Sequence, residues 1–574
     1  MREQHLDEQH ELRAALREVT GLCAAVFGFS ALVNLLIFTG PLYMMQVYDR
    51  VLAAHSVETL LALSVIALVM FVFIGLFDAI RGLVLLRIGA RMQKRLDARV
   101  MVAALRRLEQ TPGAAEGLAA EQDVEALHRL IASPVVVALC DVVWAPLFLA
   151  ALFVFDAALG WLALGGGGFL VLLALMAGWL AREPLSVAAP PAAAAARLAA
   201  QMRVDPSGLR ATGLSAGVLR LWTDHSMSAL SFRVTAMDRT AMVGAATRAL
   251  RMALQSAVLG LGALLVLRDE LGAGALFAAS VMTGRALAPV EIAISQWTMV
   301  TRALEAWQRL ARLLESAPDI SPRLPLPRPE ARLEVRGLRA RPPGATRPTL
   351  WIDRLELRPG QVLGVIGPSG SGKSTFARAV AAVWPPQAGS IRLGGAKLPL
   401  QDDTAVGYLP QTIFLIEGTV AQNIARFAPE PDHGAIIAAA RNAGAHEMIL
   451  GLPQGYDTRL AFGGAPLSGG QAQRISLARA MFGNPVMLVL DEPHAHLDHA
   501  GAEALAQTLR HVRAGGGIAV ITAHRPVALA LCDLILVLDE GRVRAFGPRD
   551  QVLRAMLQSS ANTTLRAVAT AARA

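Results

Sequence analysis

Residues 367–375 combine three glycines with a lysine and four hydroxyl groups in a spacing typical of a phosphate-binding loop. The apolar stretch Gln361–Ile366 before them predicts a buried strand, and Lys373 opens a predicted helix whose N-terminus faces phosphate. The chain has only three lysines, and its other basic positions are arginines, so a lysine at 373 indicates a specific role. Its ammonium suits the β- and γ-phosphates. The predicted phosphate site comprises Gly367, Pro368, Ser369, Gly370, Ser371, Gly372, Lys373, Ser374 and Thr375.

Two carboxylates follow a second apolar stretch, Val486–Leu490, which predicts another buried strand. Asp491 suits Mg²⁺, with Ser374 as the other protein oxygen, and Glu492 suits polarisation of an attacking water. In isolation the pair would also fit an acidic turn at a strand end, although less well. The phosphate loop upstream favours the catalytic interpretation.

Two further polar residues follow predicted strands. Gln411 comes after GYLP and has an amide that can reach the metal or the water, which makes Ser374, Gln411 and Asp491 the predicted Mg²⁺ ligands. His524 follows the strand Gly517–Thr522 and can bond the γ-phosphate. A lone histidine at a strand end also fits a structural role, so its assignment depends on its neighbours. We therefore predict Glu492, His524 and Gln411 as catalytic residues.

A second candidate phosphate grip lies in the stretch Leu467, Ser468, Gly469, Gly470 and Gln471. Its serine and two glycines at a predicted helix start are typical of anion binding by free backbone N–H groups. Why one chain carries two such grips is not evident from the residues alone.

The first half of the chain is apolar enough to cross a membrane. The whole chain of 574 residues is 54% hydrophobic and only 17% charged, and the long apolar runs lie in this half. A bilayer needs about 20 apolar helical residues, and uncharged or nearly uncharged runs predict six spans. These runs are Val19–Tyr48, Thr59–Phe77, Ile131–Phe155 (interrupted only by Asp141), Ala157–Ala181, Met252–Leu267 and Leu271–Gly284.

Arginines orient the predicted spans. They crowd the connections after the second and fourth spans, for example Arg81, Arg87 and Arg91, which predicts that these connections are cytoplasmic. The net charge is +9, but the basic residues are spread along the chain and form no patch interleaved with aromatic residues. We therefore expect no nucleic-acid partner. An even number of spans then places the phosphate loop in the cytoplasm.

Composition shifts predict five segments. We expect a cytoplasmic segment over residues 1–18, a transmembrane domain over 19–315 and a proline-rich linker over 316–330. An α/β nucleotide-binding domain is expected over 331–555, followed by a flexible tail over 556–574. The predicted fold is therefore a membrane α-helical bundle followed by an α/β P-loop domain.

The ordered motifs resemble those of ABC transporters, and the six N-terminal spans resemble an ABC exporter half. The motifs are the phosphate loop, GYLPQ, LSGGQ, LVLDEP, Leu497-Asp498 and His524. Segments such as PLYMMQVYDRVL, VVWAPLFLAALF and VWPPQAG resemble the type I secretion permease/ATPases that export alkaline metalloproteases and haem-scavenging proteins from Gram-negative bacteria. The resemblance implies ATP and Mg²⁺ as cofactors and Asp498 in a dimer-contact loop.

The resemblance also implies partners and a location. It implies a homodimer in the lipid bilayer of the bacterial inner membrane, working with a periplasmic membrane-fusion adaptor and an outer-membrane channel. In such dimers LSGGQ grips the γ-phosphate of the ATP held by the other chain, which would explain two grips. Only about 18 polar residues precede the first span, so we expect no N-terminal peptidase-like domain there. A secreted protein substrate with an uncleaved C-terminal signal is therefore expected rather than a peptide with a leader. The alternatives are a lipid or drug flippase and a soluble ABC-type ATPase.

Two positions depart from the family pattern. Pro342 stands where many ABC domains place an aromatic residue against adenine, and Trp351 is a weak substitute. Phe462 stands where exporters often carry glutamate.

In the membrane half, charged residues beside apolar runs fit either helix ends or a polar path for cargo; these are Asp78, Asp141, Asp156, Arg285 and Glu291. Pro289 predicts a kink in the sixth span.

Overall fold

The computed structural model describes residues 4–111, 115–316, 327–345, 347–399, 404–461, 467–494, 499–523 and 529–556. The chain divides into two compact units, Met1–Asp319 and Ile320–Ala574. The proline-rich stretch predicted as a linker lies mostly outside the described residues.

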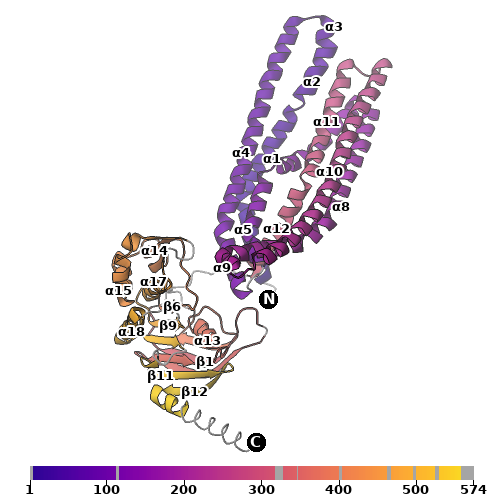
Figure 1. Ribbon diagram of the computed structural model, residues 1–574. Helices are drawn as coiled ribbons and strands as arrows, with labels where there is room; N and C mark the ends of the chain where they lie inside the picture. Colours follow the sequence, from indigo (N-terminus) through magenta and orange to yellow (C-terminus); the bar gives the residue numbers. More distant parts are fainter. Residues whose placement is uncertain are drawn as a thin grey trace, which may run out of the picture. The chain divides into compact units, whose positions relative to one another are not determined.

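The first unit is helical throughout its described part (Figure 1). One short π-helical turn, Val47–Val51, joins α2 to α3. The helices are α1 (Gln4–Leu36), α2 (Thr39–Gln46), α3 (Leu52–Ala54), α4 (Val57–Gln110), α5 (Ala115–Ile131), α6 (Pro134–Val142), α7 (Ala145–Phe155), α8 (Ala157–Val204), α9 (Pro206–Ala211), α10 (Ser215–Leu267), α11 (Ala273–Ser295) and α12 (Trp297–Ser316).

Among the described residues, five segments contain a helix long and apolar enough to cross a membrane: Thr20–Ala54, Val57–Gln110, Ala157–Leu180, Ser215–Leu267 and Ala273–Ala293. Helices α6 and α7 pass the same test together and are bent by 46° relative to each other. Counted as one broken span, this pair brings the number to the six that the apolar runs predict. The predicted run with Asp141 thus forms two short helices rather than one.

Three helices are much longer than a bilayer requires. Helices α4, α8 and α10 have 54, 48 and 53 residues, so α4 alone measures about 80 Å against a hydrocarbon core of about 30 Å. Side chains fix two of their starts, because Ser56 accepts a hydrogen bond from Thr59 N and Asp156 accepts one from Ala158 N. The arginine-rich stretches after the second and fourth spans are therefore continuations of membrane helices.

The second unit contains a ten-stranded mixed sheet and a separate two-stranded one. The large sheet has the order β5-β4-β1-β2-β12-β11-β3-β10-β9-β6. The strands are β1 (Leu333–Ala340), β2 (Leu350–Leu357), β3 (Val362–Ile366), β4 (Ala388–Leu393), β5 (Ala396–Lys397), β6 (Val406–Leu409), β7 (Gly418–Thr419), β8 (Arg459–Leu460), β9 (Met487–Asp491), β10 (Ile518–Thr522), β11 (Leu534–Asp539) and β12 (Arg542–Pro548).

Helices cover both faces of the central strands. The helices of this unit are α13 (Lys373–Val380), α14 (Val420–Ile424), α15 (His433–Asn442), α16 (His446–Leu450), a 3₁₀ turn (Gly455–Asp457), α17 (Gly469–Met481) and α18 (His499–Ala514). Along β9, Met487 and Val489 join the core that includes α13, whereas Leu488 and Leu490 join the core that includes α17 and α18. Such near-continuous burial explains why these strands read as unbroken apolar runs.

The strand directions determine where the candidate site forms. Strands β3, β10, β9 and β6 are consecutive in the sheet and all run parallel. Their carboxyl ends therefore meet at one edge of the sheet, where ligand sites of open α/β sheets form. The segments that follow them begin at Gly367, Ala523, Glu492 and Pro410.

Candidate functional site

The phosphate loop connects β3 to α13 in the strand–loop–helix arrangement that the motif requires. Glycine is needed at two of its positions. A Cβ on Gly367 would lie 2.1 Å from the Leu538 carbonyl oxygen, and Gly372 has a φ of 96°, in the left-handed region. The loop can therefore turn tightly and direct its backbone N–H groups at an anion.

Lys373 is the first residue of α13 and is almost completely buried. Its ammonium donates hydrogen bonds to the carbonyl oxygens of Gly367 (3.0 Å) and Pro368 (2.9 Å), so it lies over the loop. Burial lowers the pKa of this ammonium, while Glu492 and Asp491 act in the opposite direction. The side chain brings a cation to the phosphate loop beside both carboxylates.

Ser374 and Asp491 meet beside the loop. The Ser374 hydroxyl donates to Asp491 Oδ1 at 3.1 Å, and Asp491 is fully buried. The other carboxylate oxygen, Oδ2, is buried without a hydrogen-bond partner among the described residues. A buried carboxylate oxygen lacking a donor is costly unless a ligand satisfies it. The donor set of a hydroxyl and a carboxylate fits Mg²⁺, which prefers oxygen ligands.

Glu492 and Gln411 form a second contact at the same edge. Gln411 Nε2 donates to Glu492 Oε2 at 2.9 Å, which joins the ends of β6 and β9. Glu492 has a φ of 51°, a left-handed backbone that is uncommon for a residue with a Cβ. Strained backbone of this kind clusters at functional sites, and here it accompanies the carboxylate predicted to act on water.

The structure brings together most of the predicted phosphate, metal and catalytic residues. The loop residues 367–375, Gln411, Asp491 and Glu492 all lie at the carboxyl edge of the parallel strands. His524 and Asp498 lie outside the described residues, as does Phe462. The roles of these three residues stay predictions.

The LSGGQ stretch begins a helix, as its residues predict. Ser468 caps α17: its hydroxyl accepts from Gln471 N (3.3 Å), and Gln471 Oε1 accepts from Ser468 N (2.9 Å). This capping box leaves the hydroxyl proton of the exposed Ser468 able to donate to an anion. The buried Gln473 of α17 donates to the Pro493 carbonyl, which ties this helix to the segment after β9.

The position expected to contact adenine carries no aromatic ring, but Trp351 is linked to the loop by backbone hydrogen bonds through Gly541. Pro342 follows β1, and Trp351 is the second residue of β2. The Arg542 guanidinium lies over the Trp351 ring, 5.6 Å from its centroid. Gly541 lies in the turn between β11 and β12. Its carbonyl accepts a hydrogen bond from Trp351 N, and its N–H donates to the Ser371 carbonyl of the phosphate loop. Trp351 is therefore joined to the phosphate loop through the backbone of Gly541.

The sequence interpretation missed Thr522, the last residue of β10. Its hydroxyl donates to Asp491 Oδ1 and accepts from Glu492 N, both at 2.8 Å, and the residue is fully buried. One hydroxyl therefore supports the proposed metal carboxylate and the strained backbone of the proposed base. The signal was present, because Thr522 is the only polar residue in an otherwise apolar predicted strand.

Thr522→Val is expected to lower ATP turnover about tenfold, equivalent to about 1.4 kcal/mol, by removing the bridge between Asp491 and Glu492. Nucleotide affinity should change less, because the phosphate loop is intact, and Thr522→Ser should restore turnover. The control is Thr508→Val, which removes an equally buried hydroxyl bonded to the Ala504 and Asn442 carbonyls. Steady-state kinetics decide: equal loss of turnover in both valine variants would reduce Thr522 to a packing role.

Comparisons with known proteins agree with this geometry. Residues 352–495 match the ABC transporter family. The chain is 41% identical to the type I secretion system ATP-binding protein PrsD of Rhizobium meliloti (strain 1021), over 95% of this chain and 94% of that protein. It is 27% identical to the cyclolysin secretion/processing ATP-binding protein CyaB of Bordetella pertussis (strain Tohama I), over 93% and 76% of the two chains.

A solved structure supports the fold over both units. A bacterial Atm1-family ABC exporter with ATP bound superposes with a TM-score of 0.80, covering 94% of this chain and 96% of that one. The two sequences are 21% identical, so this likeness concerns the fold alone.

Proposed function

The chain belongs to the ABC transporter family, among the type I secretion ATP-binding proteins, and from this premise we propose that it exports an unfolded protein. It lies in the bacterial inner membrane through its apolar helices and couples ATP hydrolysis to transport. The observation that carries the proposal is the 41% identity to a secretion ATPase over nearly the whole of both chains.

In the proposed reaction, the phosphate loop and Lys373 bind the β- and γ-phosphates of ATP. Ser374 and Asp491 would hold Mg²⁺, whose charge neutralises the phosphates when it is bound, and Gln411 contributes its amide oxygen. Glu492 accepts a proton from the attacking water, while its bond to Gln411 holds the carboxylate at the loop. His524 is proposed to bond the γ-phosphate.

We propose two shared ATP sites in a homodimer. Ser468 is exposed at the start of α17, so its hydroxyl is accessible to a nucleotide held by a second copy. In this arrangement each chain supplies Leu467–Gln471 to the site of the other, and Asp498 lies in the contact between them. Each copy then carries two half-sites, which answers why the chain has two phosphate grips.

The proposed cargo is a protein with a C-terminal signal, passed to a periplasmic adaptor and an outer-membrane channel. Deleting the gene in its host is expected to abolish accumulation of one or a few proteins in the medium, with membrane lipids unchanged. Quantitative proteomics of the medium and lipid analysis measure this. The wild-type gene should restore secretion, whereas a Glu492→Gln copy should not. An intact secretome with altered lipids would support the flippase instead.

A further inference from the structure

A polar cavity lies at the cytoplasmic end of the membrane unit. Its volume is about 770 Å³, and it is lined by residues of α5, α8, α10 and α12 together with Gln296, which lies between α11 and α12. Ligand-binding pockets of proteins have volumes of about 300–1,000 Å³. The cavity is therefore large enough to hold a ligand.

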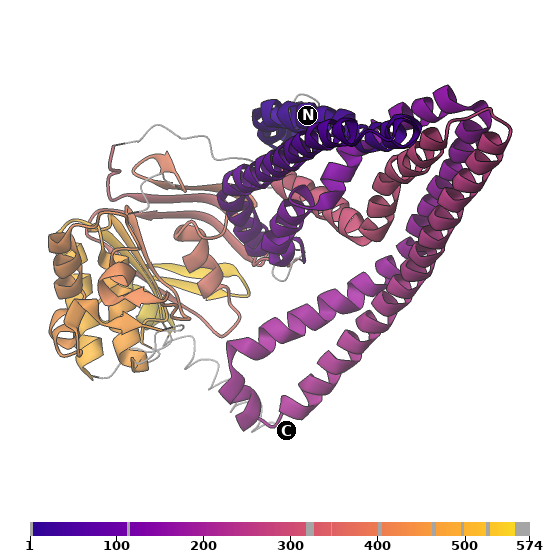
Figure 2. The same ribbon diagram turned by 90° about the horizontal axis from the view of Figure 1, so that it is seen from above.

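Two pairs of helices form the walls of this cavity. Helices α5 and α12 pack through a core that includes Val124 and Ala303. Helices α8 and α10 pack against each other, and Arg239 of α10 donates to the Leu180 carbonyl of α8 at 3.1 Å. Figure 2 shows the pair α8 and α10 diverging from α4, on which α5 packs. The cavity thus lies where one pair of helices separates from the other.

Small side chains on α8 leave the cavity open. Ala188, Ala189 and Ala192 line it, within a stretch in which residues 188–196 are all alanine or proline. Larger side chains at these positions would interdigitate with the opposite wall, as side chains do in a packed interior. The alanines therefore leave polar side chains of α5, α10 and α12 uncovered.

The cavity lies beyond the hydrocarbon part of the bilayer. One apolar span ends at Ala293, and Arg302 follows nine residues later, after about 14 Å of helical chain. Another span ends at Leu180, and Ala188 follows eight residues later, after about 12 Å. A ligand therefore reaches the cavity from the cytoplasm rather than from the lipid.

Three carboxylates and four arginines line the cavity. Arg309 donates to both carboxylate oxygens of Asp123, at 2.9 and 2.7 Å, and lies 3.7 Å from Glu305. Arg129 pairs with Glu125. All three carboxylates of the cavity thus have an arginine partner within it.

The remaining two arginines of the cavity are unpaired. Arg233 of α10 and Arg302 of α12 line it from opposite walls, and both residues are exposed. Neither has a hydrogen-bond or ion-pair partner in the part of the chain that the structure describes. A guanidinium group has five N–H donors in a planar fork that matches a carboxylate. Two such groups at one cavity attract an anion.

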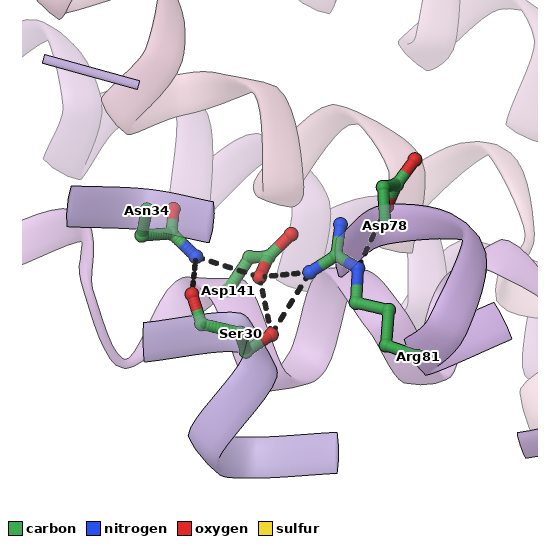
Figure 3. Close-up of polar contacts among 5 residues, drawn as sticks. All are labelled: Ser30, Asn34, Asp78, Arg81 and Asp141. Carbon is green, nitrogen blue, oxygen red and sulfur yellow. Dashed lines mark hydrogen bonds and ion pairs between the residues drawn. The ribbon is translucent and has the colours of Figure 1, made fainter. Parts of the chain in front are cut away.

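Arginines near the spans are paired elsewhere in this unit. Arg81 is 6% exposed and donates to Asp141 at 2.8 Å and to Asp78 at 2.7 Å (Figure 3). Arg251 pairs with Glu291 at 2.8 Å. Three carboxylates that the sequence offered for a polar path are thus bound to arginines of the protein itself, whereas the two unpaired arginines of the cavity remain available to a ligand.

We propose that this cavity binds a carboxylate-bearing segment of an unfolded cargo polypeptide, and that Arg233 and Arg302 bind its carboxylates. These carboxylates come from aspartate or glutamate side chains or from the end of the cargo chain, since both present the same group. Gln122 and Gln296 offer amide groups to the backbone of an extended segment. The proposal rests on the proposed function in protein export and names the chemical feature of the cargo that the chain recognises.

The first test measures peptide binding to the purified full-length protein in nanodiscs of neutral lipid. Three short glycine–serine peptides with an uncharged dye are compared by fluorescence anisotropy. One has aspartates and an amidated C-terminus, one has a free C-terminal carboxylate as its only charge, and one is neutral, with asparagines and an amidated C-terminus. At least one carboxylate peptide should bind about tenfold or more tightly than the neutral peptide, which identifies the source of the carboxylate.

The same measurement includes the results that would overturn the proposal. Equal affinity for the neutral peptide, or no binding of either carboxylate peptide, would remove carboxylate recognition from the cavity. Short-chain phosphatidylglycerol is the third probe. If it bound through Arg233 and Arg302 while neither carboxylate peptide did, the cavity would be a lipid site instead.

The second test changes the unpaired arginines. Arg233→Gln and Arg302→Gln should each weaken binding of the carboxylate peptide about tenfold, because a charge-assisted hydrogen bond is lost. Arg233→Lys keeps the charge and should retain most of the affinity, which separates loss of the charge from loss of the fold. Arg220→Gln is the control, since Arg220 is an exposed arginine of the same helix outside the cavity. Unchanged affinity in both glutamine variants, or an equal loss in the control, would contradict the proposal.

The third test fills the cavity without changing its charge. Ala189→Trp should weaken binding of the same peptide by a similar factor, whereas Ala200→Trp, at an exposed position of α8 outside the cavity, should not. Equal affinity in both tryptophan variants would place the peptide elsewhere. Peptide binding requires no secretion, so the two failures are distinguishable: loss of secretion on gene deletion without arginine-dependent binding would remove this site and leave the export function.

Discussion

Glu492→Gln is expected to slow ATP turnover by about 10²-fold or more while ATP stays bound and the dimer stays closed. Glutamine keeps an oxygen that can accept the Gln411 amide at its present 2.9 Å, so the geometry survives and only the base is lost. Turnover and nucleotide occupancy are measured on the same purified protein.

A carboxylate-to-amide change elsewhere provides the control. Glu356 lies in β2 and pairs with Arg332 at 2.8 Å, away from the phosphate loop. Glu356→Gln should retain normal hydrolysis, because exposed ion pairs contribute little. Near-normal hydrolysis in Glu492→Gln would remove this residue from the base role.

Lys373→Ala should differ from both by weakening nucleotide binding itself, since the cation over the loop is lost.

The second large effect concerns whether two copies share each ATP site. Two copies are fused in tandem, the phosphate loop is disabled by Lys373→Ala and the signature by Ser468→Arg. If each site takes Lys373 from one copy and Ser468 from the other, both changes in one copy spoil both sites. That fusion should be inactive.

The split arrangement provides the contrast. With Lys373→Ala in one copy and Ser468→Arg in the other, both defects fall in one site and the second remains whole. This fusion should close around one ATP and hydrolyse at up to roughly half the normal rate if the sites act independently. A self-contained site predicts the reversed pattern, which would contradict sharing. If both fusions are inactive, vanadate trapping of nucleotide decides, since only the split fusion should trap it.

The sequence by itself predicted the membrane class, spans that the structure matches if α6 and α7 count as one, and the loop that the structure places between β3 and α13. An apolar run of bilayer length folds into a helix in lipid, because a helix bonds every backbone polar group within the segment. The phosphate loop was equally local: the strand before it, its glycines and Lys373 lie within 15 residues of one another. Features set by neighbours in the chain can be predicted from the chain.

The tertiary structure alone decided which distant residues share a contact. Thr522 bridges Asp491 and Glu492 only because β10 lies beside β9 with parallel register, and Trp351 approaches the phosphate loop only through the turn at Gly541. The charges near the spans are similar, since Asp141 appeared as an interruption and Arg81 as part of a basic stretch, yet they are partners. Strand order and helix packing arise from the summed burial of many side chains across the chain, so no local pattern of residues records them.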